Sequence, residues 1–217
     1  MRSSVVVVIP ALNCQSTLDS VIRKLPPGVV SIVVDDGSTT PLVAPSVVRH
    51  PVNRGYGAAQ KTGYAAALDL GATRVVLLHG DDQYDTSDTL ALADALDSAQ
   101  AALGSRFLVD PHVIPGWRRL GNRALTALAN ARFGTAHTEL HTGARAFSAA
   151  LLRSLPLQDY SDDYLFDQQM LCAILRRGLP IAERPVHVRY DDTVQSISPS
   201  RSLRYGLGCV AEIVRRS

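Results

Sequence analysis

The sequence predicts an α/β fold with a mostly parallel central sheet flanked by helices. Three short runs at 5–9, 29–34 and 74–79 are rich in β-branched residues and apolar almost throughout, as in strands that are buried on both faces. Segments with helical spacing separate these runs, and such alternation is typical of a doubly wound sheet. Because 217 residues can bury a full core and no linker, repeat or low-complexity tract interrupts them, we expect one domain over 1–217.

The first two helices should follow the first two strands. The first is expected over 17–25, with Ser16 as its N-cap and Asp19 completing a capping pattern. The Pro-Pro-Gly sequence at 26–28 should end it. The second helix is expected over 57–70.

A third helix should cover 87–98, with Ser87 or Asp88 capping its start. The stretch 40–48 lies where a crossover helix would normally stand, but it contains two prolines. Proline is poorly tolerated inside a helix. We therefore expect an extended loop or a single turn there.

The second half of the chain is less regular. Helical apolar spacing predicts helices over 116–133 and 165–177, the latter closed by a glycine and a proline. Residues 181–190 alternate as in a strand, and 202–216 form an amphipathic helical segment.

Composition excludes several classes of protein. A hydrophobic content of 46% with a net charge of +2 excludes intrinsic disorder and gives no indication of a nucleic-acid partner. Three cysteines without CxxC spacing form neither a disulfide framework nor a zinc site, and they fit a reducing cytoplasm. No apolar run approaches a membrane span, and the apolar start lacks a signal-peptide cleavage site. We expect a cytoplasmic protein with at most peripheral membrane contact.

Two polar motifs end the first two predicted strands: IPALN at 9–13 and VVDDGST at 33–39. Open α/β sheets bind ligands at the carboxyl ends of their strands. The adjacent carboxylates of Asp35 and Asp36 can accept hydrogen bonds from a nucleobase NH or from ribose hydroxyls. The alternative is a solvated Asp-Gly turn.

Two further motifs are rich in small or acidic residues. In NRGYGAAQKTGYAAAL at 53–68, small residues allow a ligand to approach the backbone, and a helix N-terminus favours anions. In LLHGDDQYD at 77–85, an extended backbone would point His79, Asp81 and Gln83 to one side. Together with water and phosphate oxygens, these groups can hold Mg²⁺ or Mn²⁺ beside a diphosphate. The alternative is an acidic loop that caps the next helix.

The order of these motifs resembles that of the family 2 glycosyltransferases. IPALN, VVDDGS, NRGYGAAQKTGY, HGDDQYD, GSRF and HTGARAF follow one another as in that family, and the similarity extends over about residues 5–208. The dolichol-phosphate-mannose-synthase-like branch is the most similar. The resemblance implies the Rossmann-like glycosyltransferase A fold and a nucleotide-diphosphate sugar as donor. It also implies a donor-binding half at about 1–100 and an acceptor-binding half at about 101–217.

The resemblance also implies roles for individual residues on the donor side. Asp81 matches the last Asp of the family's DxD-type motif and Gln83 the Gln after it, whereas His79 stands where many relatives have the first Asp. Cys14 replaces the usual Glu after PxxN. We assign the metal to Asp81, Gln83 and His79. The residues assigned to donor binding are Pro10, Leu12, Asn13, Asp35, Asp36, Gly57, Lys61, Asp81 and Arg118.

On the acceptor side, Arg106 in GSRF resembles the arginine that meets the acceptor phosphate in the dolichol-phosphate branch. Arg118 or Arg119 could add a second phosphate contact with Asn122, unless these side chains only form a solvated helix surface. Glu139 is the leading candidate for a general base if the acceptor is a hydroxyl. A phosphate acceptor is already ionised and needs no base, so Glu139 would then only orient it. A buried structural glutamate is the alternative. Other candidate bases are Asp162, Asp163 and Asp167.

We therefore expect an inverting, metal-dependent glycosyltransferase with Asp81, Glu139 and Arg106 as catalytic candidates. Its donor would be UDP- or GDP-linked, its cofactor Mg²⁺ or Mn²⁺, and its favoured acceptor a polyprenyl phosphate. One alternative acceptor is a hydroxyl of a small molecule, lipid or glycan. An alternative of another class is a non-catalytic protein that binds sugar nucleotides.

The C-terminal segment 198–217 has an apolar flank and a basic flank. Its arginines are Arg201, Arg204, Arg215 and Arg216. It could close the core, form a homodimer contact, or rest on the inner face of an anionic membrane.

Overall fold

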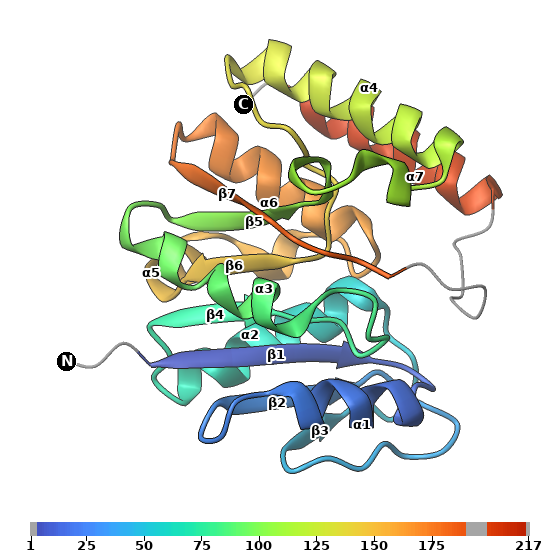
Figure 1. Cartoon of the computed structure of the whole chain (residues 1–217), viewed down its shortest axis with the longest axis vertical. Coiled ribbons are helices and arrows are strands. Elements are labelled where there is room, and N and C mark those ends of the chain that lie inside the picture. The colour runs from blue at the N-terminus through green and yellow to red at the C-terminus, as the bar shows by residue number, and fades with distance from the viewer. Residues whose placement is uncertain (1–3, 190–198, 216–217) are drawn as a thin grey trace.

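The computed structural model describes residues 4–189 and 199–215, and its central feature is a seven-stranded sheet (Figure 1). The strands lie in the order β3-β2-β1-β4-β6-β5-β7, and β6 runs antiparallel to both of its neighbours while the other pairs are parallel. Their bounds are β1 Val5–Ala11, β2 Val30–Asp35, β3 Val47–Arg49, β4 Arg74–Leu77, β5 Ala101–Ser105, β6 Arg145–Ser148 and β7 Ile181–Pro185. The predicted α/β fold with a mostly parallel sheet is confirmed.

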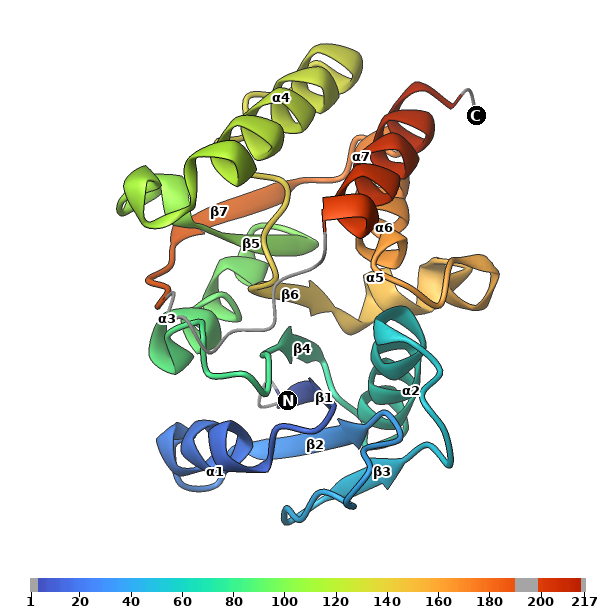
Figure 2. The same ribbon diagram turned by 90° about the vertical axis from the view of Figure 1, so that its right-hand side faces the viewer.

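Helices cover both faces of the sheet, and two of them gather at its β7 end (Figure 2). The α-helices are α1 Gln15–Lys24, α2 Tyr56–Asp69, α3 Thr86–Ala91, α4 Gly116–Phe133, α5 Ala149–Ser154, α6 Leu165–Arg176 and α7 Pro199–Val214. Short 3-10 turns are η1 Asp94–Asp97, η2 Arg106–Leu108, η3 Pro111–Val113 and η4 Leu157–Asp159.

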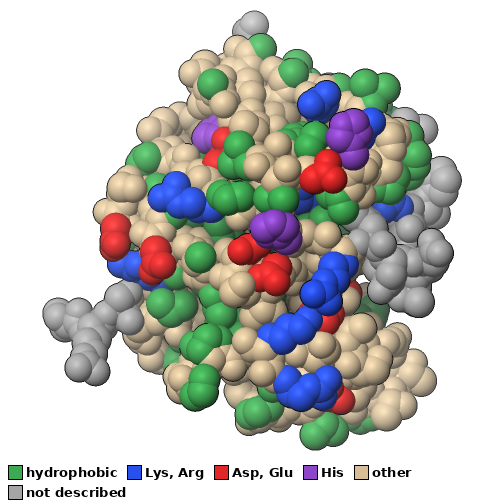
Figure 3. Space-filling view, in the orientation of Figure 1, with side chains coloured by type: hydrophobic (Ala, Val, Ile, Leu, Met, Phe, Trp, Pro, Cys, Tyr) green, Lys and Arg blue, Asp and Glu red, His purple; other side chains and the backbone are tan. Residues whose placement is uncertain are grey.

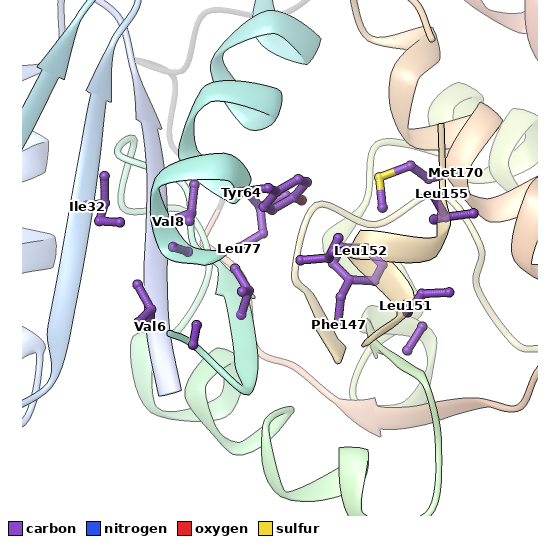
Figure 4. Close-up of a cluster of buried hydrophobic side chains, with 14 of the residues drawn as sticks. Val6, Val8, Ile32, Tyr64, Leu77, Phe147, Leu151, Leu152, Leu155 and Met170 are labelled. Atoms are coloured by element: carbon purple, nitrogen blue, oxygen red, sulfur yellow. The ribbon is translucent and has the colours of Figure 1, made fainter. Parts of the chain in front are cut away.

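Alternation along β1 divides the core between the two faces. Val6 and Val8 point to one face, where they join side chains of α2, α5 and α6, among them Tyr64 and Met170 (Figure 4). Val7 and other residues of opposite parity join α1 and the α3–η1 segment on the other face. Both faces are buried, which explains why these strands have a continuous apolar sequence. A third cluster joins β5 to α4, α6 and α7.

Several expected elements differ in detail. The start of α1 lies at Gln15 after an N-cap at Cys14 that makes no side-chain cap bond, so the Ser16 cap was wrong. The expected third helix is broken into α3 and η1, and Asp85 caps α3 by accepting bonds from the next turn. In the loop after β2, residues 47–49 add the edge strand β3.

In the second half, α4 spans 116–133 as predicted, and α6 and α7 lie close to their expected positions. The expected strand 181–190 ends at Pro185, and its last residue lies outside the described part. The expected helix 202–216 also reaches beyond that part at its C-terminal end. Strands β5 and β6 and helix α5 were not predicted.

Candidate active site

The end of β2 is held by the buried side chain of Asp35. Its carboxylate accepts hydrogen bonds from the backbone NH groups of Ser38 at 2.9 Å and Leu42 at 3.1 Å, and it pairs with Arg49. Burial raises the pKa of Asp35, but hydrogen bonds from Ser38 and Leu42 and the charge of Arg49 outweigh it, so the pKa lies below the ordinary value. Asp35 therefore shapes the loop after β2 from inside the protein.

Asp36 organises the next loop. Its carboxylate accepts backbone hydrogen bonds from Arg54 and Gly55, each at 2.9 Å, and lies 2.6 Å from Nδ1 of His50. The residue is only 4% exposed. Asp36 thus ties the end of β2 to the segment that leads into α2, and nucleoside contact by this carboxylate stays a prediction.

The N-terminus of α2 faces protein, which corrects the expectation of a ligand close to its glycines. A Cβ added at Gly55 would lie 2.4 Å from the carbonyl oxygen of Asp162, and one at Gly57 would lie 2.5 Å from that of Ser161. The amide of Ala58 donates to the Asp162 carbonyl at 3.1 Å. These glycines allow the 161–163 loop to pack against the helix.

The side chain of Lys61 also contacts the loop that packs against the start of α2. Its ammonium group lies 2.9 Å from Oδ1 of Asp162 and also donates to the backbone carbonyl of Tyr160. The side chain is buried and stands over the ring of Phe166. In this structure Lys61 anchors the 158–162 loop.

The motif after β4 turns sharply, so the expectation of an extended segment with three aligned side chains was wrong. Residues 80–82 form a turn in which Asp82 has a φ of 58° and pairs with Lys24. A Cβ added at Gly80 would lie 3.2 Å from the side chains of Ala11 and Cys14, and the Gly80 carbonyl accepts a 2.7 Å bond from Thr17. The turn therefore lies directly against the end of β1.

Asp81 stands exposed on this turn. One carboxylate oxygen accepts a 3.2 Å bond from the NH of Gln83, and the other has no protein partner among the described residues. No group of three or more His, Cys, Asp or Glu side chains suited to a metal ion occurs within 4–189 and 199–215. Mg²⁺ at phosphate sites often uses only one or two carboxylates, with phosphates and water as its other ligands. Asp81 fits that kind of site.

The side chain of His79 is engaged by two tyrosines and not by the Asp81 turn. Its Nε2 lies 2.9 Å from the hydroxyl of Tyr56, and its ring meets the rings of Tyr56 and Tyr84 edge-on. A Cβ added at Gly143 would come within 2.5 Å of the imidazole. Tyr84 also accepts a bond from the amide of Gly143 at 2.8 Å. His79 belongs to an aromatic cluster that joins the β4 turn to the segment before β6.

Tyr56 and Tyr84 were not predicted as site residues, although they lie inside the motifs at 53–68 and 77–85. Burial raises the pKa of Tyr56 well above its ordinary value, so it remains a neutral hydroxyl. Gln83, the third expected metal ligand, lines a pocket with Lys24 and Asp82, and its carbonyl accepts a 2.8 Å bond from Arg189.

Arg106, which directly follows β5, forms a buried ion pair with Glu139. Glu139 is fully buried and accepts from the backbone NH of Arg106 at 2.7 Å, from its Nε at 2.8 Å and from Asn122 at 2.7 Å. Arg106 also donates to the carbonyl of His141 at 2.9 Å. With its oxygens turned toward these donors, Glu139 is placed to hold Arg106 rather than to accept a proton from an acceptor.

His141 lies next to this pair, because its carbonyl accepts a bond from Arg106. The pKa of its imidazole is strongly lowered. Burial, followed by the charges of Arg145 and Arg106, lowers its pKa to about 3. Its Nε2 is buried and has no hydrogen-bond partner in the described part of the chain, while Nδ1 lies 3.3 Å from the hydroxyl of Tyr205.

The remaining predicted residues lie apart from one another. Pro10 is half-buried in β1 and Leu12 is 42% exposed beyond it. Asn13 has a φ of 51° and accepts from Thr39 at 2.9 Å, which joins the ends of β1 and β2. Arg118 on α4 lies over the ring of Trp117, with its guanidinium carbon 5.0 Å from the ring centroid.

Comparison with known families decides the class of protein. The family described as glycosyl transferase family 2 has a model that matches residues 6–155. The chain belongs to this family. It is therefore a glycosyltransferase, and the predicted resemblance is confirmed.

Similar proteins occur among archaea. Protein MJ1222 of Methanocaldococcus jannaschii is 27% identical over 203 residues, covering 88% of this glycosyltransferase and 84% of that protein. The UDP-N-acetylglucosamine–dolichyl-phosphate N-acetylglucosaminyltransferase of Methanococcus voltae is 28% identical over 149 residues, covering 67% and 59%. Glycosyltransferase AglJ of Haloferax volcanii is 24% identical over 207 residues, covering 91% and 68%.

Solved structures with the same fold include glucosyl-3-phosphoglycerate synthase of Mycobacterium tuberculosis. Its complex with UDP has a TM-score of 0.74 at 22% identity, covering 98% of this chain and 79% of that one. Its complex with Mn²⁺, UDP and glucosyl-3-phosphoglycerate has a TM-score of 0.71 at 23% identity, with the same coverage. This likeness confirms the glycosyltransferase A fold. Within the described residues, no helix is long and apolar enough to cross a membrane.

Proposed function

We propose that this glycosyltransferase moves a sugar from a UDP- or GDP-linked donor to a polyprenyl phosphate, with inversion at the anomeric carbon. The observation that carries the proposal is the exposed Asp81 carboxylate on a turn packed against the end of β1. Strand ends of open α/β sheets are where such ligands bind. The solved structures with UDP and Mn²⁺ or Mg²⁺ support a nucleotide donor and a divalent cation for the same fold.

Asp81 is the side chain we propose to hold Mg²⁺ or Mn²⁺, together with donor phosphates and water. A cation there would offset the negative charge that develops on the diphosphate leaving group. His79 is better placed to position the turn through Tyr56 and Tyr84 than to bind the ion. Asp35 and Asp36 would act on the donor mainly by shaping the loops around it.

The acceptor is proposed to approach from the side of Arg106. A phosphate oxygen would attack the anomeric carbon as the bond to the diphosphate breaks on the opposite face. The attacking phosphate is already ionised, so no base is required, which suits a Glu139 whose carboxylate is engaged by Arg106 and Asn122. The dolichyl-phosphate transferase of M. voltae supports this acceptor class.

We also propose that both halves act as one domain. Strands β1–β4 would form the donor half and β5–β7 the acceptor half. The single sheet that runs through all seven strands supports this arrangement.

Release of the nucleotide diphosphate tests the proposal. A panel of UDP-, GDP- and dTDP-sugars should first be screened by thermal shift with Mg²⁺ or Mn²⁺, since a bound donor raises the melting temperature. Turnover should then require the cation and a polyprenyl phosphate. Turnover with a water-soluble alcohol such as phosphoglyceric acid, and none with polyprenyl phosphate, would replace the lipid acceptor by a hydroxyl.

A further inference from the structure

Helix α4 presents an apolar face to solvent. Its exposed positions recur at helical spacing and form a stripe along the helix. The stripe consists of Trp117, Leu120, Gly121, Ala124, Ala127 and Ala131. Trp117 is 58% exposed and Leu120 is 71% exposed. A helix on the surface of a water-soluble domain normally shows its polar side there, whereas α4 carries apolar residues on its outer side as well as on its inner side.

Three uncharged polar residues of α4 lie on the inner side, next to the apolar residues that pack on the core. Asn122 donates to Glu139 at 2.7 Å, and Asn130 donates to the carbonyl of His137 at 2.8 Å. Thr126 between them is buried and accepts from the amide of Leu140 at 3.2 Å. Because these bonds fix which side faces inward, the outward apolar stripe is a fixed feature of the fold.

The stripe is flanked by positive charge. Helix α4, all of which the structure describes, contains four arginines and no acidic residue. Arg123 and Arg132 are exposed on the two flanks, while Arg118 lies over the ring of Trp117. Figure 3 shows apolar and basic side chains next to each other at the upper end of the molecule, where Figure 1 places α4.

Helix α7 repeats this pattern next to α4. Its exposed apolar residues Leu207, Val210 and Val214 lie at spacings of three and four, and Arg204 and Arg215 are exposed as well. Glu212 on this helix pairs with Arg176 at 2.7 Å and is nearly buried. The two helices pack together, and Figures 1 and 2 place both at the end of the molecule away from β3.

We propose that the α4–α7 end of the molecule binds the surface of an anionic lipid bilayer. An apolar stripe with a tryptophan and arginine flanks is the composition of helices that lie in the membrane interface. Arginines near an anionic surface strengthen such binding. A second copy of the chain fits less well, because a two-fold contact would place the same arginine-rich face against itself. Binding of this kind goes beyond the proposed function and does not depend on the donor or the acceptor.

Trp117 is the only tryptophan of the chain, so its fluorescence reports directly on this surface. The 217-residue chain should be mixed with vesicles of phosphatidylcholine and phosphatidylglycerol, without donor or acceptor. Insertion of the ring should shift its emission to the blue and protect it from iodide. Raising the salt from about 0.1 M to about 1 M shortens the Debye length to about 3 Å and should release most of the protein. Vesicles of phosphatidylcholine alone should bind weakly.

Two substitutions and their matched controls test the face itself. Arg123→Gln with Arg132→Gln should weaken partitioning about 25-fold, since each arginine contributes about five-fold. Leu120→Ser should weaken it about ten-fold. The controls are Arg153→Gln and Val43→Ser, exposed residues outside α4 and α7 that should leave binding unchanged. An unshifted emission with anionic vesicles at low salt would overturn the proposal. Equal binding by the α4 variants and the controls would also overturn it. Protection of Trp117 from iodide by dimer formation, without vesicles, would overturn it as well.

Discussion

Glu139→Ala should destabilise the fold severely. The substitution removes a fully buried carboxylate that accepts bonds from the backbone NH and side chain of Arg106 and from Asn122. Arg106 is only 8% exposed, so its charge would stay buried beside a cavity. Breaking a buried ion pair by removing one partner costs about 3–5 kcal/mol, of which a hydrogen bond to a charged group contributes about 1.5–3 kcal/mol. We expect a loss of about 3–5 kcal/mol in the free energy of unfolding.

Urea unfolding followed by circular dichroism measures this loss. The matched control is Asp97→Ala, which removes an exposed partner of Arg74 and should cost at most about 1 kcal/mol. In the double variant Glu139→Leu with Arg106→Met, much of the stability should return, because both charges leave together. A loss below about 1 kcal/mol for Glu139→Ala would refute the reasoning. So would a double variant whose loss is the sum of the two single losses.

Two further predictions concern loops and pH. Asp36→Ala should lower the free energy of unfolding by about 1–3 kcal/mol, because it leaves the amides of Arg54 and Gly55 unpaired. Calorimetry should also show weaker nucleotide binding. An unchanged free energy of unfolding would exclude a role of Asp36 in holding the loop before α2. The pKa of His141 is lowered to about 3 in the folded protein, so between roughly pH 6.5 and 3 the unfolded chain binds a proton at this residue and the folded chain does not. The free energy of unfolding should therefore fall as the pH falls through this range. His141→Phe should flatten that part of the stability curve in urea titrations at several pH values, and an unchanged slope would contradict the assignment.

The sequence predicted the sheet well where strands are buried on both faces. The apolar run that became β1 packs on α1 on one side and on α2 on the other, and its short length and β-branched residues favour a strand. Strand β5, with the sequence Ala-Ala-Leu-Gly-Ser, was missed because small residues carry little strand preference. Its place is fixed by pairing with β6 and β7, which local sequence does not show.

The candidate site was predicted by position but not by contact. The motifs brought Asp81 and the end of β1 together as expected, because parallel strands end at one edge. Spacing could not show that the chain turns at 80–82 or that the ring of His79 packs against Tyr56 and Tyr84. It also could not show that Lys61 and the α2 glycines face the 158–163 loop, since that contact joins segments about 100 residues apart.

Transfer of labelled sugar to a polyprenyl phosphate by the wild type and by Asp81→Asn tests the central claim most directly. With Mn²⁺ and the donor selected by thermal shift, the wild type should form a labelled lipid, and a chelator should stop the reaction. Asp81→Asn should keep its melting temperature, because the side chain is exposed, but lose nearly all turnover. Turnover by Asp81→Asn within a few-fold of the wild type, or turnover that the chelator leaves unchanged, would contradict a reaction that depends on a cation at Asp81.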